Sequence, residues 1–131
     1  MNGQRIDFVA DTSAIICLCR RHPQVEQQVQ GKVFAITFVT MAELLLGVLK
    51  SEKPEAAWSR VVDVLFGHRL IRVSPSTPMN YARIFHDLEH RGLRIPVNDI
   101  WIAALAIESG LPLLARDEHF TRVKGLTAIK C

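Results

Sequence analysis

Short apolar segments alternate with helix-like segments along the whole chain, and this alternation limits the fold more than any other feature. The strand-like segments are residues 5–10, 33–37, 70–73, 111–115 and 127–130. The helix-like segments between them are residues 12–20, 23–30, 39–50, 54–66, 77–91 and 99–109. Strands that are apolar throughout need cover on both faces, so the pattern predicts an α/β fold. We expect three layers, α/β/α, with a mainly parallel sheet of about five strands.

Length and composition are those of one globular unit. The chain has 131 residues, which predicts a single domain over residues 1–131. A hydrophobic fraction of 49% argues against disorder. The net charge of +3 suits a polyanionic partner, although ordinary surface lysines and arginines give the same value.

The sequence shows no targeting signal and no apolar run near the ~18 residues that cross a bilayer. Its cysteines are Cys17, Cys19 and Cys131, an odd number without the spacing of a zinc ribbon or a redox motif. Free thiols in a cytoplasmic protein, with no membrane contact, are the simplest expectation.

Acidic residues stand where a parallel sheet places its ligands, beyond the carboxyl ends of the strands. Asp11 directly follows the first strand, and Asp117 follows the fourth by one residue. Asp99 opens the helix that leads into the fourth strand, so it is expected at the same edge. Glu43 lies within the apolar run 41–46, where a solvated residue is not expected on most faces.

Each of these acids also has a structural interpretation. Asp11, Asp99 and Asp117 suit helix caps or turns, and Glu43 suits a polar helix edge that would include Thr40. Convergence at one edge would instead require that some acids are protonated or that cations lie between them, because two carboxylates ~5 Å apart repel by about 3 kcal/mol at an effective dielectric of ~20. All-oxygen ligands favour Mg²⁺, with Mn²⁺ as the alternative, over zinc or copper.

These residues occur in motifs that resemble those of PIN domains. The motifs are Asp11-Thr12-Ser13, Glu43-Leu44, Asn98-Asp99-x-x-Ile102-Ala103-Ala104 and Leu114-Ala115-Arg116-Asp117-x-x-Phe120. Their order and spacing are similar to those of the family, and length and motif style are most similar to the VapC toxin ribonucleases of VapBC toxin–antitoxin pairs. The resemblance implies a Mg²⁺-dependent endoribonuclease, with Asp11 and Asp99 as metal ligands. The resemblance implies that Glu43 and Asp117 bind the metal through water molecules or orient such a water.

The resemblance also implies a supporting role for Ser13 and a homodimer. It implies an antitoxin that blocks the site, and contact with DNA only through that antitoxin. A crevice lined by acids attracts cations, so we expect the antitoxin to insert an Arg or Lys side chain there. Apolar residues that flank this cation are expected to dock on the helices around residues 44–49 and 61–66. Arg116 replaces the small or polar residue that the family often has. It is a candidate for contacting RNA phosphate or for pairing with a neighbouring acid.

Other activities fit the sequence less well. A haloacid-dehalogenase-like phosphatase needs a second Asp where Ser13 stands, and a response-regulator receiver needs an Asp after the third strand. His86 and His90 match the inverted zinc-protease pattern H-x-x-E-H, but the match is short and no third ligand follows. The remaining alternative is a degenerate PIN fold that binds RNA or protein without catalysis.

Several basic and aromatic residues have both a binding and a structural interpretation. Trp58 and Trp101 lie in apolar helical stretches, which favours a core or dimer position over base stacking. A stripe of Val61, Val62, Leu65 and Phe66 is expected in the core, with partner binding as the alternative. The candidate phosphate contacts, each more typical of a solvated surface charge, are Arg20, Arg21, Lys50, Lys53, Arg91 and Arg94.

Overall fold

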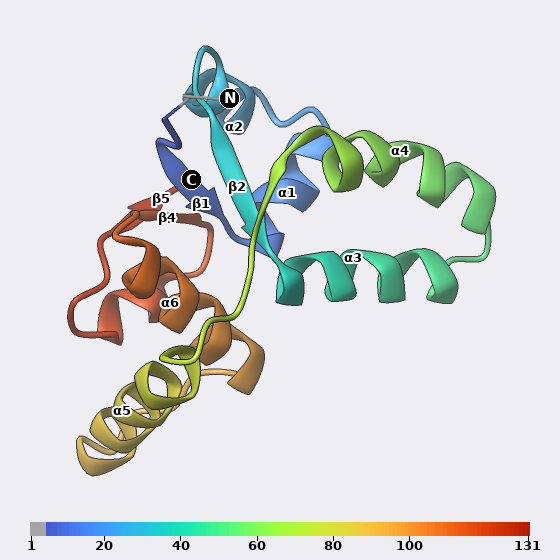
Figure 1. Ribbon diagram of the computed structural model, residues 1–131. Helices are drawn as coiled ribbons and strands as arrows, with labels where there is room; N and C mark the ends of the chain where they lie inside the picture. Colours follow the sequence, from blue (N-terminus) through green and yellow to red (C-terminus); the bar gives the residue numbers. More distant parts are fainter. Residues whose placement is uncertain (1–4) are drawn as a thin grey trace.

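A parallel sheet of five strands forms the centre of the computed structural model, which describes residues 5–131 (Figure 1). The strand order is β3-β2-β1-β4-β5, and every neighbouring pair is parallel. The strands are β1 (Phe8–Ala10), β2 (Phe34–Thr37), β3 (Arg69–Ile71), β4 (Leu113–Ala115) and β5 (Ala128–Lys130). The chain builds outward from β1 to β3 and then returns to β4 on the other side of β1. The strand order therefore reverses between β1 and β4, as expected for the binding edge of such a sheet.

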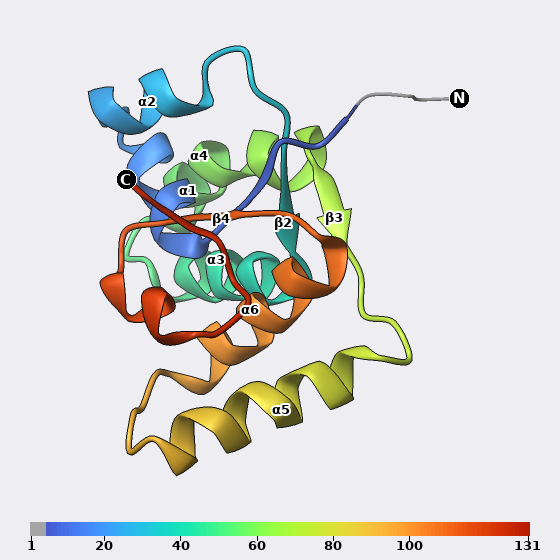
Figure 2. The same cartoon turned by 90° about the vertical axis from the view of Figure 1, so that its left-hand side faces the viewer.

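Helices cover both faces of the sheet, which confirms the three-layer arrangement (Figure 2). They are α1 (Thr12–Cys19), α2 (Pro23–Val29), α3 (Phe38–Lys50), α4 (Pro54–Gly67), α5 (Thr77–His90) and α6 (Val97–Ser109). Phe8 and Ala10 pack on one side with residues of α1, α2, α3 and α4. Val9, between them, packs on the other side with α5 and α6. This alternation is the two-residue period of a strand buried on both faces.

Helices α3 and α4 run side by side and project from the body as an arm (Figure 1). Leu44 and Val48 of α3 pack with Val61 of α4 in one hydrophobic cluster. The stripe predicted on α4 is only partly in the core, because Phe66 is 76% exposed while Val61 and Leu65 are buried. Within residues 5–131, no helix is long and apolar enough to span a membrane.

The elements agree with the predicted ones to within a few residues, with one addition. Helix α6 begins at Val97, so Asp99 is its third residue and does not open it. Strand β4 begins after Pro112, which has no N–H to donate to a sheet ladder. The 3-10 helix η1 (Glu118–Arg122), which the sequence did not predict, connects the end of β4 to the last strand.

Candidate active site

Asp11 lies at the junction between β1 and α1. Its backbone N–H donates to the carbonyl oxygen of Leu114 at 2.9 Å, which fixes the junction against β4. Its Oδ2 atom accepts from the backbone N–H of Ser13 at 3.2 Å, so the predicted cap role is real. The other oxygen, Oδ1, is buried and has no hydrogen-bond partner. Capping therefore accounts for one oxygen of a residue that is only 5% exposed, and leaves the other free for a ligand.

Ser13 holds Asp11 and also connects the two strands at the reversal point. Its hydroxyl donates to Oδ2 of Asp11 at 2.6 Å and accepts from the backbone N–H of Arg116 at 3.0 Å. Arg116 is the first residue after β4, so this relay joins the ends of β1 and β4. The geometry agrees with the supporting role expected for Ser13.

Replacing Ser13 by Ala is expected to cost about 1 kcal/mol of stability, because a hydroxyl that both donates and accepts is lost. Loss of an outer hydrogen bond to a metal-binding carboxylate typically weakens metal affinity by about 10- to 100-fold, so any Mg²⁺ bound by Asp11 should need a concentration higher by that factor. Thermal unfolding at increasing Mg²⁺ concentration measures both effects. An unchanged Mg²⁺ midpoint in Ser13→Ala would show that Asp11 needs no such support.

Glu43 points toward the same edge from α3. Its Oε1 lies 2.6 Å from the Thr12 hydroxyl, and its Oε2 accepts from Asn98 Nδ2 at 3.4 Å. The alternative interpretation of Glu43 placed Thr40 on a polar edge of α3. Thr40 is instead fully buried, and its hydroxyl lies 3.0 Å from that of Thr12. Glu43 is thus held by polar residues from α1 and α6.

Asp99 lies in the first turn of α6, but it does not cap the helix. The N-cap residue is Pro96, without a side-chain cap hydrogen bond. Oδ2 of Asp99 instead lies 2.6 Å from Nε2 of His119. The side chain is only 17% exposed.

Asp117 is the acid that the structure does not bring into the group directly. Its side chain is 64% exposed, and its Oδ1 lies 3.4 Å from Nδ1 of His119. It precedes η1 but makes no side-chain cap hydrogen bond. His119 thus lies between Asp99 and Asp117, and sequence reasoning missed it. The available signal was its position inside the motif that runs from Asp117 to Phe120.

The three inner acids affect one another electrostatically. Burial raises the pKa of Asp11 and the charge of Glu43 adds to the rise, while hydrogen bonds from Ser13 and Thr12 oppose it. Burial, followed by the charge of Asp11, raises the pKa of Asp99 to about 6, with a further contribution from Glu43. The contact with His119 lowers it. Burial and neighbouring charges thus disfavour the anionic forms of both aspartates.

This arrangement fits a hard divalent cation. The free Asp11 Oδ1, the raised pKa values of two aspartates and the all-oxygen character of the inner acids each favour Mg²⁺ or Mn²⁺. Among residues 5–131, however, no three His, Cys, Asp or Glu side chains already form a ready set of metal ligands. Contacts to Thr12 and His119 occupy one oxygen each of Glu43 and Asp99.

The other residues singled out in the sequence lie elsewhere. Arg116 donates from Nη1 to Sγ of Cys17 at 3.0 Å, so its guanidinium contacts a thiol. His86 and His90 stack with ring centroids 6.3 Å apart on α5. The rings of Trp101 and Tyr81 stack with centroids 3.8 Å apart, which agrees with a structural role for Trp101.

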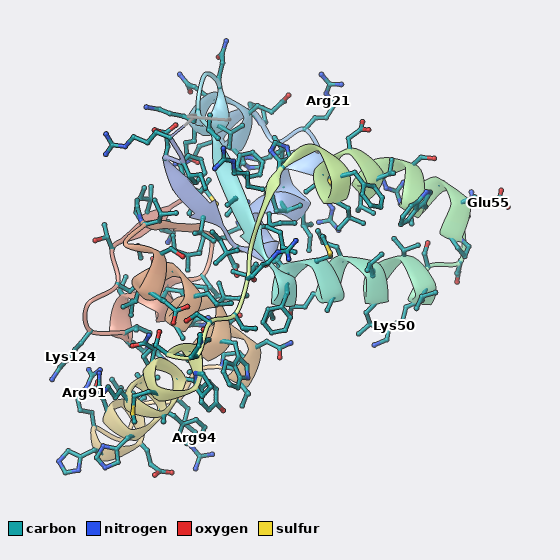
Figure 3. All side chains as sticks on the ribbon, in the orientation of Figure 1. Arg21, Lys50, Glu55, Arg91, Arg94 and Lys124 are labelled. Atoms are coloured by element: carbon teal, nitrogen blue, oxygen red, sulfur yellow. The ribbon has the colours of Figure 1, made fainter. Side chains whose placement is uncertain are left out.

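The candidate phosphate contacts do not share one surface. Figure 3 shows Arg21 near the top of the body, Lys50 at the far end of the arm, and Arg91 with Arg94 at the end of α5. Arg91 is also paired with Asp87, its Nε donating to Oδ2 at 2.9 Å. A continuous basic track through these residues is therefore absent from the described part of the chain.

Comparisons with known proteins identify the family of this chain. The family model described as PIN domain matches residues 8–126. The chain is 31% identical to Ribonuclease VapC4 of Mycobacterium tuberculosis, over 98% of each chain. It is 31% identical to Ribonuclease VapC2 of Haemophilus influenzae, covering 92% of this chain and 95% of that one. The crystal structure of VapBC2 from Rickettsia felis bound to a promoter DNA fragment matches with a TM-score of 0.85 and 26% identity. That match covers 96% of this chain and 99% of the other.

Proposed function

Because the chain belongs to the PIN-domain family, we propose that it is a Mg²⁺-dependent endoribonuclease, the toxin of a toxin–antitoxin pair. One observation carries the proposal: Asp11 has a buried, unpartnered carboxylate oxygen beside Glu43 and Asp99, where the strand order reverses. Relatives that match over nearly the whole chain are named ribonucleases, which supports the same activity.

Asp11 and Asp99 are the residues that would hold Mg²⁺ directly, with Glu43 beside them and Asp117 reaching the group through water. A bound Mg²⁺ supplies a Lewis acid for the phosphodiester and lowers the pKa of an attacking water. The chain contributes orientation: Ser13 holds one oxygen of Asp11, and Thr12 holds one of Glu43. Mn²⁺ is the ion expected to substitute.

Cleavage of RNA by the purified protein tests this function. We expect cleavage in Mg²⁺ or Mn²⁺ and its loss in EDTA, with recovery when the metal is restored. Cleavage that continues in EDTA would contradict the metal mechanism. RNA binding without cleavage under any metal would support the alternative, a PIN fold that acts only as a binding module.

A groove of about 450 Å³ leads to this site between α1, α3 and α4. It is lined by the apolar residues Ile16, Leu44, Val48 and Val61 and by polar residues that include Glu43, Arg20 and Arg60. We propose that the C-terminal segment of an antitoxin lies in this groove and extends an Arg or Lys among the acids. The apolar walls and the Glu43 carboxylate complement such a segment, and Arg20 and Arg60 also line the groove. Solved structures of the same fold include VapBC2 of Rickettsia felis and a member of the VapBC family of toxin–antitoxin systems from Mycobacterium tuberculosis, which supports this partner.

The groove includes only part of the surface around residues 44–49 and 61–66 on which the antitoxin was expected to dock. Leu49 and Phe66 are strongly exposed, at 79% and 76%, but neither lines the groove. The dimer, the indirect contact with DNA, the single domain over residues 1–131 and the cytoplasmic location remain predictions from the sequence and its resemblance.

Filling the groove is expected to weaken antitoxin binding. A Cβ atom at Gly47 would meet no heavy atom within 4 Å, so Gly47→Leu adds bulk to the groove without a backbone clash. We expect a loss of at least about tenfold in affinity, measured with the co-expressed antitoxin, since disrupting the well-packed centre of an interface costs about 2 kcal/mol or more.

The matched control is Gly67→Leu, where a Cβ atom also meets open space but outside the groove. It should bind the antitoxin like the wild type. Because the inserted Arg or Lys would occupy the place of the metal ion, Mg²⁺ should also compete with the antitoxin. An affinity that is indifferent to both Gly47→Leu and Mg²⁺ would place the antitoxin elsewhere.

A further inference from the structure

His119 has its two ring nitrogens directed at two different carboxylates. Nε2 lies 2.6 Å from Oδ2 of Asp99, and Nδ1 lies 3.4 Å from Oδ1 of Asp117. The side chain is only 14% exposed. A histidine enclosed in this way restricts the orientation of both acids, and it restricts the nearer one more.

The core, rather than Asp99 alone, fixes the position of the His119 ring. Phe120, the next residue in η1, is fully buried and packs on the face of the sheet that α6 covers. The rings of His119 and Phe120 are tilted against each other with centroids 4.8 Å apart. Because Phe120 anchors η1, His119 is presented to α6 from a rigid support.

The hydrogen bond between His119 and Asp99 is not part of the N-terminal cap of α6. Pro96 is the N-cap residue of α6, and Asp99 makes no cap hydrogen bond. The hydrogen bond instead connects residues 20 positions apart, and it uses only Oδ2 of the carboxylate. This leaves Oδ1 of Asp99 for another partner, as Ser13 leaves Oδ1 of Asp11.

We propose that His119 is a positioning residue that holds Asp99 through Oδ2 so that the remaining carboxylate oxygen faces the metal. This inference rests on the proposed Mg²⁺-dependent function, and it adds a residue to the site. Outer partners of metal-binding carboxylates typically change metal affinity by about 10- to 100-fold when removed. The shorter distance and lower exposure of Asp99 make it, rather than Asp117, the carboxylate that depends on His119.

Three substitutions separate the two contacts of the ring. The side-chain amide of His119→Gln reaches the place of Nε2 and can still donate to Asp99. The amide of His119→Asn reaches only the place of Nδ1, near Asp117. His119→Ala keeps neither contact. His86→Ala, which removes an exposed histidine on α5, is the matched control.

The measurement is thermal unfolding of each full-length variant over a Mg²⁺ titration at constant ionic strength. Metal that binds only the native state raises the melting temperature by mass action. We expect His119→Ala and His119→Asn to raise the half-maximal Mg²⁺ concentration by about 10- to 100-fold, and His119→Gln by less than about threefold. His86→Ala should match the wild type. Melting without metal checks that each variant folds.

A purely structural role would lower every melting temperature and leave the Mg²⁺ midpoint unchanged, and that result would overturn the proposal. An equal loss in all three His119 variants would also overturn it, because it would show that the Asp99 hydrogen bond is not the cause. No Mg²⁺ response in the wild type would overturn the metal-dependent function together with this inference. A normal wild-type response with unaffected variants would overturn the role of His119 alone.

Discussion

Replacing Asp11 by Asn is expected to lower RNA cleavage by at least about a thousandfold. A metal ion contributes several kcal/mol of transition-state stabilisation, and about 4 kcal/mol corresponds to that factor. The amide oxygen of Asn still accepts from Ser13, so the cap of α1 remains and the protein should fold. The assay is cleavage of a labelled RNA under excess Mg²⁺, together with circular dichroism to check the fold.

Asp63→Asn is the control for this substitution, since Asp63 is an exposed acid on α4 outside the site. It should cleave at the wild-type rate. If Asp11→Asn retained wild-type cleavage while folded, the buried free oxygen of Asp11 would have no part in the reaction, and the metal mechanism would fail.

Replacing Asp99 by Asn is expected to stabilise the metal-free protein at neutral pH by about 2 kcal/mol. Asp99 has a native pKa of about 6 and an ordinary value of 3.8. Each pKa unit corresponds to about 1.4 kcal/mol, which gives an upper value of about 3 kcal/mol before solvent screening and a weaker His119 contact are allowed for. A neutral amide removes this penalty, and chemical denaturation in EDTA measures the gain.

The pH dependence has a definite sign. Between pH 4 and 6, roughly, native Asp99 keeps a proton that the unfolded chain has lost, so native stability falls as pH rises through this window. In Asp99→Asn the stability should fall less steeply with pH. The fall that remains comes from Asp11, whose pKa is also raised. Mg²⁺ should reverse the order at neutral pH by stabilising the wild type and not Asp99→Asn.

Asp87→Asn provides a control of opposite sign. Hydrogen bonds from Arg91 hold the pKa of Asp87 below its ordinary value, so its contribution to stability is present at neutral pH and is lost on acidification. Its replacement should not stabilise the protein. An Asp99→Asn variant that is less stable than the wild type in EDTA would contradict the electrostatic strain at the site.

The sequence predicted most of the fold because strands and helices differ in their hydrophobic periods and because the residues that end the elements are recognisable. Gly110, for example, has a φ of +68° at the end of α6, as a helix-ending glycine should. Segment η1 was missed because its five residues have no apolar period, and only Phe120 among them is buried. Its 3-10 form depends on how that one ring enters the core.

The site was predictable where position along a strand determined it. Asp11 ends β1, and Glu43 is flanked by apolar residues, so both could be identified from their neighbours. Asp117 was expected on the same rim, yet its side chain is 64% exposed and turns toward His119. Side-chain direction after a strand depends on the following turn, and here that turn is the unpredicted η1. For the same reason His119 itself could not be found from periodicity.

Anomalous diffraction from crystals soaked in Mn²⁺ tests the central claim most directly, because it locates the ion itself. We predict a peak within about 2.5 Å of a carboxylate oxygen of both Asp11 and Asp99, with Oδ1 of Asp11 as the nearer atom of that residue. Glu43 should lie beside the ion, directly or through water. A protein that cleaves RNA with Mn²⁺ but shows its ion away from Asp11 and Asp99 would contradict the account.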